Sequence, residues 1–225
     1  MDFGGKASVA WQELTRWLGS FVFPDSCLRC GAAAPTSPLC PACLTEASGA
    51  IAPNPETPPG LTRLHCGVTL TEPARVLVHG LKYHGQRRNA KALVDLSRPS
   101  IQPGLFPADT LLVPVPLHAT RRRERGYNQS HLLARAWSPV LGLPVCEALQ
   151  RTRSTGTQTR LSADARRANL EGALRPSKAF VPGRPCLLID DVATTGSTLS
   201  ACAAVLLKAG ASDVQALSCA WAPGG

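Results

Sequence analysis

The segment Cys186-Leu-Leu-Ile-Asp-Asp-Val-Ala-Thr-Thr-Gly-Ser-Thr-Leu199 decides the fold of this chain. It begins with a short apolar run, typical of a buried strand, that ends at the acids Asp190 and Asp191. A loop of hydroxyl-bearing residues around Gly196 then leads into a stretch rich in alanine and leucine, which predicts a helix. Strand, polar loop and helix in this order indicate an α/β fold with a parallel sheet.

The same segment predicts a ligand site. Carboxylates at the end of a strand can accept hydrogen bonds from the vicinal hydroxyls of a ribose. The loop amides and hydroxyls can surround a phosphate, whose charge the amino-terminal end of the next helix favours, and Gly196 lets the backbone come close. The alternative is an ordinary turn with helix caps, which the length of the ordered pattern disfavours. The residues assigned to the phosphate loop are Ala193, Thr194, Thr195, Gly196, Ser197 and Thr198.

Apolar runs and helical patterns alternate through the rest of the chain from residue 63 onward. Strands are predicted at 64–70, 111–115, 186–189 and 214–220, and helices at 72–83, 89–96, 128–141 and 199–209. This alternation predicts a mostly parallel sheet with helices on both faces. Ligands of such sheets bind at the carboxyl ends of the strands, where Asp190 and Asp191 lie.

Four cysteines near the amino terminus form two Cys-x-x-Cys pairs: Cys27 with Cys30, and Cys40 with Cys43. Four thiolates offered from two tight turns suit tetrahedral zinc, so we predict a structural zinc site. The alternatives are two disulfides, which the absence of a recognisable export signal disfavours, and a redox pair, which the duplication disfavours. A closed site of four cysteines would fold the module or dock a partner and would not catalyse.

The chain divides at a proline-rich stretch. We expect an amino-terminal helix and zinc module at 1–50, a stiff linker at 51–62, and the main domain at 63–225. Trp11, Leu14, Leu18 and Phe21 stand at helical spacing, which predicts an amphipathic helix that packs on the protein. No stretch reaches the ~20 apolar residues of a membrane span, so we expect a cytoplasmic protein.

Positive charge is concentrated in one part of the chain. The net charge is +9 and the isoelectric point about 9.4, and residues 121–175 hold eleven arginines against four acids. This positive charge is either an ordinary solvent-exposed surface or a phosphate-binding surface that uses the arginine side chains. A hydroxyl-rich and basic stretch at 151–169 predicts a lid over the site. The residues assigned to phosphate or DNA contact are Arg121, Arg122, Arg123, Arg125, Arg151, Gln158 and Arg166.

Several motifs together resemble those of the ComF family of competence and DNA-utilisation proteins. The acids and the Thr-Thr-Gly loop are similar to the phosphoribosyl pyrophosphate motif of type I phosphoribosyltransferases. The other matching elements are the four-cysteine knuckle, Leu81-Lys-Tyr83, Val113-Pro-Val-Pro-Leu117, Arg125-Gly-Tyr-Asn-Gln-Ser130, Gln158 with Leu161, and Arg166 to Asn169. The resemblance spans about residues 21–220. Ala193 and Leu174 depart from it, since the family more often has a bulkier apolar residue and an aromatic there.

The resemblance implies a type I phosphoribosyltransferase fold that binds phosphoribosyl pyrophosphate with Mg²⁺. Asp190 and Asp191 would be the catalytic pair that holds the ribose hydroxyls, and Pro114, Val115 and Pro116 would lie at the pyrophosphate, unless they form a plain strand-ending turn. It also implies single-stranded DNA and a competence helicase or another DNA-uptake protein as partners. No residue stands out as a general base, so the acceptor of a transfer, and turnover itself, stay open. A rival reading is a non-catalytic DNA-binding factor with a regulatory sugar-phosphate pocket, which the low aromatic content of 5% opposes.

Overall fold

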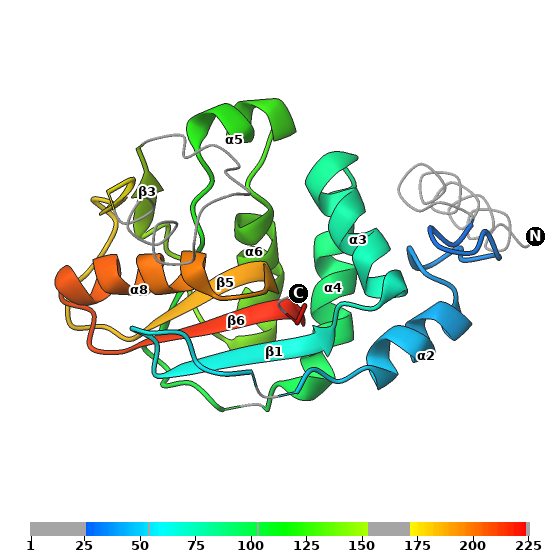
Figure 1. The fold of residues 1–225 in the computed structure, drawn as a ribbon, viewed down its shortest axis with the longest axis horizontal. Coiled ribbons are helices and arrows are strands. Elements are labelled where there is room, and N and C mark those ends of the chain that lie inside the picture. The colour runs from blue at the N-terminus through cyan, green and yellow to red at the C-terminus, as the bar shows by residue number, and fades with distance from the viewer. Residues whose placement is uncertain (1–25, 54, 103, 153–171, 224–225) are drawn as a thin grey trace, which may run out of the picture.

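The computed structural model describes residues 26–53, 55–102, 104–152 and 172–223. Its centre is a four-stranded parallel sheet in the order β1-β6-β5-β2 (Figure 1). The bounds are Arg63–Thr69 for β1, Leu111–Pro114 for β2, Cys186–Ala193 for β5 and Val214–Trp221 for β6. The two central strands read as almost continuous apolar runs because both of their faces are covered.

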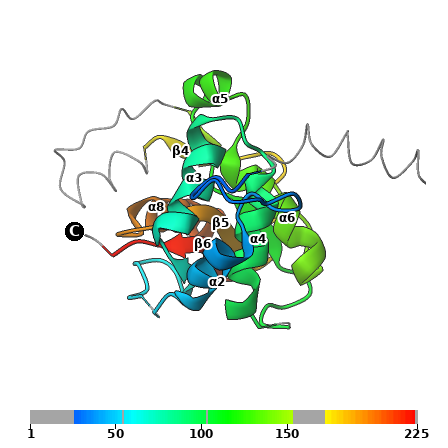
Figure 2. The ribbon, with the colours of Figure 1, turned by 90° about the vertical axis from the view of Figure 1, so that its right-hand side faces the viewer.

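Helices cover both faces of the sheet (Figures 1 and 2). Helix α8 (Ser197–Lys208) packs on one face, while α4 (Asn89–Ser97) and α6 (Gln129–Leu141) pack on the other, with α3 (Glu72–Tyr83) against α4. Alternate residues of β5 enter the two cores: Ile189 lies in the α4–α6 core and Leu188 in the α8 core. The α/β architecture predicted from the sequence is confirmed.

Three elements carry no clear sequence signal. Strands β3 (Leu149–Arg151) and β4 (Leu174–Pro176) form a small antiparallel sheet of their own. Helix α5 (Ala119–Arg125) is short, without a buried residue, and it ends at Gly126 in the left-handed conformation. Three-residue strands and an arginine-rich helix have no apolar periodicity, so pattern reading did not find them. A 3₁₀ turn, η1 (Arg98–Ser100), follows α4.

The predicted boundaries need one correction at the site. Strand β5 was expected to end at Ile189, so that the two acids would follow it, yet it continues to Ala193. The reason is continued pairing with β6, in which Asp190 stands opposite Ser218 and Ala193 opposite Trp221. Both acids therefore lie within the paired part of β5 and not in an unpaired segment after it. Helix α6 begins as predicted, with Asn128 as its N-cap accepting from the Ser130 N–H at 3.1 Å.

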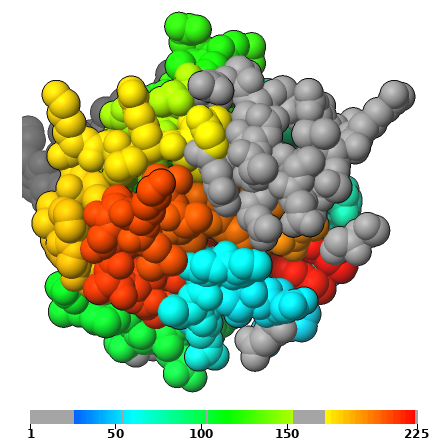
Figure 3. Space-filling view, turned by 60° about the vertical axis from the view of Figure 1, so that its left-hand side comes forward, coloured from blue at the N-terminus to red at the C-terminus, as the bar shows by residue number. Residues whose placement is uncertain are grey.

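The cysteine-bearing segment packs against the main sheet domain. Helix α2 (Pro41–Gly49) lies beside α3 and α4, and Leu39 and Ala47 are buried in the same core as α3. The following linker runs along α8, as Figure 3 shows in cyan beside orange. The predicted amino-terminal helix lies outside the described residues. No helix within the described ranges combines the length and apolar character that crossing a bilayer requires.

Candidate functional site

Asp190 and Asp191 lie at the carboxyl end of β5, and each carboxylate is held by polar partners. The Asp190 carboxylate accepts from the Ser130 hydroxyl at 2.9 Å and from the Asp191 N–H at 3.0 Å. The Asp191 carboxylate lies 3.0 Å from Lys82 Nζ, and it accepts from the Val192 N–H at 2.8 Å. Asp191 is only 2% exposed, whereas Asp190 is half-buried. Asp190 is therefore the more accessible acid for a ligand.

Burial and repulsion act on the same carboxyl group. Burial, followed by the charge of Asp191, raises the pKa of Asp190 to about 7, against the opposing effects of Lys82 and Ser130. A carboxyl group that is half ionised near neutral pH is typical of a ligand or catalytic site. An ordinary surface aspartate would be fully ionised there.

Lys82 and Ser130 are site residues that the sequence reasoning did not assign. Lys82 lies in the last turn of α3, and Ser130 lies in the first turn of α6. Both therefore reach β5 from the face of the sheet that α4 and α6 cover. The signal was present, since Leu81-Lys-Tyr83 and Arg125-Gly-Tyr-Asn-Gln-Ser130 are among the motifs of the family resemblance. Nothing local in the sequence indicates which carboxylate each one contacts.

The loop after β5 has the conformation that a phosphate cradle needs. Gly196 adopts φ +68° and precedes α8, so the first-turn amides of that twelve-residue helix point toward the loop. Thr194 and Thr195 are exposed, and the Thr195 hydroxyl donates to the Ser197 hydroxyl at 3.3 Å. Ala193 is different, because its side chain is buried in the α8 core. Of the assigned residues, Thr194, Thr195, Gly196, Ser197 and Thr198 lie on the loop or the first turn, and Ala193 lies beneath it.

A proline of the linker packs on this loop. A Cβ atom added at Gly196 would lie 2.1 Å from Pro58 Cγ, so the glycine leaves room for the proline ring. Pro58 is buried, although its neighbour Pro59 is exposed. The segment that joins the cysteine module to the sheet domain thus contacts the phosphate loop directly.

The Pro114–Val115–Pro116 turn offers no backbone N–H to an anion. Prolines have none, and the Val115 N–H donates to the Ile189 carbonyl at 3.0 Å. The Val115 carbonyl in turn accepts from the Asn128 side chain at 3.0 Å. The turn is thereby fastened between β5 and α6, and Pro114 and Pro116 present their rings to a cavity.

The four arginines of α5 have different surroundings. Arg125 lies over the ring of Tyr83 at 5.7 Å and donates to the Gln129 side chain, next to the helix that carries Lys82. Arg122 lines the same cavity as Pro114 and Pro116, and Arg123 is exposed. Arg121 is close enough to Arg151 of β3 for its charge to help lower the pKa of Arg151, a shift that burial dominates. Gln158 and Arg166 lie outside the described residues.

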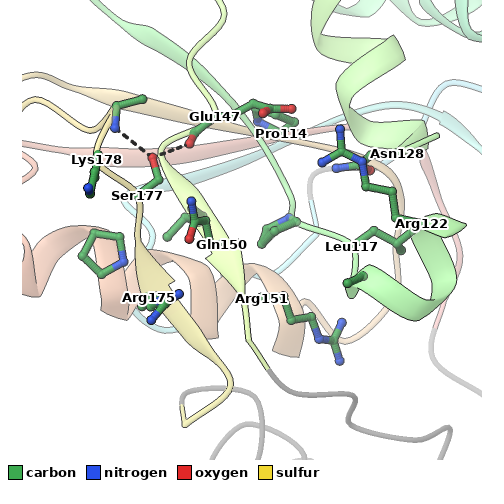
Figure 4. A pocket seen from close by; sticks show the side chains of 15 residues that line it. Pro114, Leu117, Arg122, Asn128, Glu147, Gln150, Arg151, Arg175, Ser177 and Lys178 are labelled. Carbon is green, nitrogen blue, oxygen red and sulfur yellow. Dashed lines mark hydrogen bonds between the residues drawn. The ribbon is translucent and has the colours of Figure 1, made fainter.

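This cavity has a volume of about 740 Å³ and lies between α5, the Pro114 turn and the β3–β4 pair (Figure 4). Arg122, Arg151, Arg175 and Lys178 supply four cations to its lining, and Glu147 supplies a carboxylate. Asp190 and Asp191 do not line it, but Pro114 pairs with Ile189, the residue before Asp190. The cavity and the acid pair are therefore neighbours at the same edge of the sheet.

The four cysteines of the amino-terminal module converge on one point. All four sulfur atoms lie within 4.8 Å of one another, with Cys30 Sγ 3.6 Å from Cys40 Sγ and 3.7 Å from Cys43 Sγ. Four sulfurs at about 2.3 Å from a tetrahedral zinc ion would be about 3.8 Å apart, so the cluster could hold zinc.

The surroundings of the sulfur atoms act differently on Cys27 and Cys43. Burial opposes ionisation of Cys27, yet the N–H groups of Cys30, Cys40 and Arg29 lower its thiol pKa to about 6. At Cys43, Arg29 favours ionisation, but burial and the neighbouring thiols raise the pKa to about 12. Four thiolates at these distances would repel one another strongly without a metal ion between them.

Known proteins are similar to this chain over most of its length. It is 37% identical over 199 residues to the DNA utilization protein YhgH of Escherichia coli O157:H7, covering 84% of this chain and 87% of that protein. It is 36% identical over 151 residues to Competence protein F of Haemophilus influenzae, covering 64% and 66%. It is 34% identical over 100 residues to Competence protein ComFC of Bacillus subtilis, covering 44% and 39%.

Other comparisons add little. A phosphoribosylpyrophosphate synthetase from Mycobacterium smegmatis is 23% identical, with a TM-score of 0.30, over 49% of this chain and 28% of that one, and so low a score supports no structural conclusion. No protein-family model matches the chain. The identity to the curated relatives and its coverage are sufficient by themselves: the chain belongs to the ComF family of competence and DNA-utilisation proteins.

Proposed function

We propose that this protein binds phosphoribosyl pyrophosphate with Mg²⁺ in the cytoplasm and acts in the uptake or processing of single-stranded DNA. The observation that carries the proposal is the pair Asp190 and Asp191 at the end of β5, directly before a loop whose Gly196 has φ +68°. The carboxylates would accept from the ribose 2′ and 3′ hydroxyls, and the loop amides would donate to the 5′-phosphate.

The site suits a magnesium complex of this ligand. Mg²⁺ is commonly held by one or two carboxylates together with phosphate oxygens of the substrate, and Asp190 is an accessible carboxylate beside the phosphate loop. The ion would neutralise the pyrophosphate charge. Lys82, 3.0 Å from Asp191, pairs with that buried carboxylate and fixes it in place.

The decisive experiment is calorimetric titration of phosphoribosyl pyrophosphate with and without Mg²⁺. Binding is expected only with Mg²⁺, and Asp190→Asn combined with Asp191→Asn should weaken it at least about a hundredfold, since two charge-assisted contacts are lost. Asp95→Asn, on the exposed face of α4, is the matched control. Unchanged affinity in the double variant would refute the site.

Turnover is a separate question. If the protein is a phosphoribosyltransferase, pyrophosphate should appear when the protein, the Mg²⁺ complex and a suitable acceptor are mixed. Release that depends on one acceptor would name the reaction. Binding without release for every acceptor would favour a regulatory pocket.

A second candidate function is direct binding of single-stranded DNA, which the arginines of α5 favour. Arg121, Arg122 and Arg123 are exposed on one short helix, and arginine binds backbone phosphate without sequence preference. Affinity should fall steeply with salt, and changing all three to alanine should reduce the slope of log K against log[salt] by about 2. The control removes three positive charges elsewhere, at Arg63, Lys91 and Arg98. An equal loss in both variants would show only a net-charge effect.

A further inference from the structure

The cavity beside the β3–β4 sheet carries two cations, Arg175 and Lys178, that the sugar-phosphate assignment does not include, beside Arg122 and Arg151, which it does. Its four cations come from separate elements: Arg122 from α5, Arg151 from β3, Arg175 from β4 and Lys178 from the turn after β4. Its lining carboxylate, Glu147, lies 2.9 Å from His131 Nδ1 on α6, so it is engaged away from the cations. Arg122, Arg175 and Lys178 are exposed cations that line one space, so a bound anion would be attracted to all three.

Part of the remaining lining is apolar. Pro114 and Pro116 contribute rings without N–H groups, and Leu117 and Leu149 contribute aliphatic surface. Gln150 adds an amide group that can donate and accept, whereas the Asn128 amide is already bonded to the Ser130 N–H and the Val115 carbonyl. Apolar walls with an amide group suit the faces and edges of a heterocyclic base, and the cations suit a phosphate.

The part of the cavity that carries Lys178 is held by its own backbone. The Ser177 N–H donates to the Ala148 carbonyl at 2.8 Å, and the Ser177 hydroxyl donates to the Glu147 carbonyl at 2.6 Å. The same hydroxyl accepts from the Ala179 N–H at 3.1 Å (Figure 4, dashed lines). The two sides of this wall are thus tied together, which fixes the backbone from which Arg175 and Lys178 extend.

We propose that this cavity binds a nucleoside 5′-monophosphate, with its base against the proline and leucine walls and its phosphate on the arginines and Lys178. The volume of about 740 Å³ is in the range of small-molecule sites and exceeds what a phosphate alone would fill. The site goes beyond the proposed function, since it needs neither the acid pair nor phosphoribosyl pyrophosphate. The nucleotide is either a free molecule or the phosphorylated end of a DNA strand.

The test is calorimetric titration of the full-length protein with thymidine 5′-monophosphate, and with thymidine as the uncharged control. The nucleotide should bind at least about tenfold more tightly, because hydrogen bonds to charged groups are strong. Arg175→Gln combined with Lys178→Gln should remove that advantage. Lys91→Gln combined with Arg98→Gln, which removes two exposed charges outside the cavity, should keep it. Equal binding of nucleotide and nucleoside, or an unchanged affinity in the first variant, would overturn the proposal.

Two further measurements separate the possible outcomes. Phosphoribosyl pyrophosphate should bind the Arg175→Gln/Lys178→Gln variant as it binds the unmodified protein, so failure of one site is distinguishable from failure of the other. Competition by oligothymidylate with and without a 5′-phosphate identifies the source. Displacement of the mononucleotide by the 5′-phosphorylated strand alone indicates a strand end, and displacement by neither indicates a free nucleotide.

Discussion

Asp190 is a residue whose burial opposes stability. Burial raises its pKa from 3.8 to about 7, so the folded protein disfavours the ionised form that the unfolded chain adopts freely. The contribution of the Asp190 carboxyl group to the free energy of unfolding is therefore most favourable below pH 3.8 and is lost as the pH rises through 7. Retaining such a group is typical of functional sites.

We therefore expect Asp190→Asn to stabilise the protein at pH 8 by about 1–3 kcal/mol, since each pKa unit corresponds to about 1.4 kcal/mol and partial exposure reduces the effect. The asparagine oxygen can still accept from Ser130. The gain should shrink as the pH falls toward 4. Urea unfolding at pH 5 and pH 8 measures it, with Asp95→Asn as the surface control. A gain of equal size at both pH values would contradict this assignment of the raised pKa.

At the scale of elements, the linker and the phosphate loop are one packed unit. Gly196 is needed twice, for its left-handed φ of +68° and for the space that the Pro58 ring occupies. The sequence suggested only a close approach of the backbone to a phosphate. It did not indicate the second, since Pro58 and Gly196 are far apart in the chain.

Gly196→Ala should lower the free energy of unfolding by about 2–4 kcal/mol, combining left-handed strain with overpacking against Pro58. Pro58→Ala should recover part of that loss by removing Cγ, while the strain remains. A double-mutant cycle in urea measures the coupling, and Pro59→Ala, at an exposed neighbour, should show none. Strict additivity of Gly196→Ala and Pro58→Ala would show that the linker has moved away from the loop.

At the scale of the whole molecule, the cysteine module and the sheet domain share a hydrophobic core. Cys27, Cys40 and Cys43 are buried in the same cluster as Leu77 and Leu93 of the sheet domain. Metal binding at the cysteines would then stabilise the packing of the module on α3 and α4 as well as the module itself. The domain boundary at 51–62 stays a prediction, because a shared core does not show whether either part folds alone.

We expect about one zinc ion per chain by elemental analysis. Cys27→Ser combined with Cys43→Ser should abolish it and lower the free energy of unfolding by about 3 kcal/mol or more, because structural zinc contributes directly to folding. Cys146→Ser is the control, since that thiol lies outside the cluster and serine can keep its hydrogen bond to the Ala179 carbonyl. A metal-free protein of full stability would exclude a structural zinc site.

Local patterns were sufficient for the α/β class, the four long strands, the acid pair and the four-cysteine cluster. Each is a short-range feature, in which apolar runs, adjacent carboxylates and paired Cys-x-x-Cys motifs stand within a few residues of one another. The small β3 and β4 strands and the true end of β5 were not predicted, because they depend on pairing with distant strands. The arginine-bearing α5 was not predicted because it buries no residue and so has no apolar periodicity.

Contacts between distant segments came only from the tertiary arrangement. Lys82 meets Asp191 because the last turn of α3 reaches the carboxyl end of β5, and Arg122 and Arg175 line one cavity because β3 and β4 pair beside the Pro114 turn. Strand order β1-β6-β5-β2 brings these elements to one edge of the sheet. The sequence determines which chemical groups are present and how far apart they stand along the chain. The distances between their side chains in space depend on how buried surfaces pack, which no local pattern encodes.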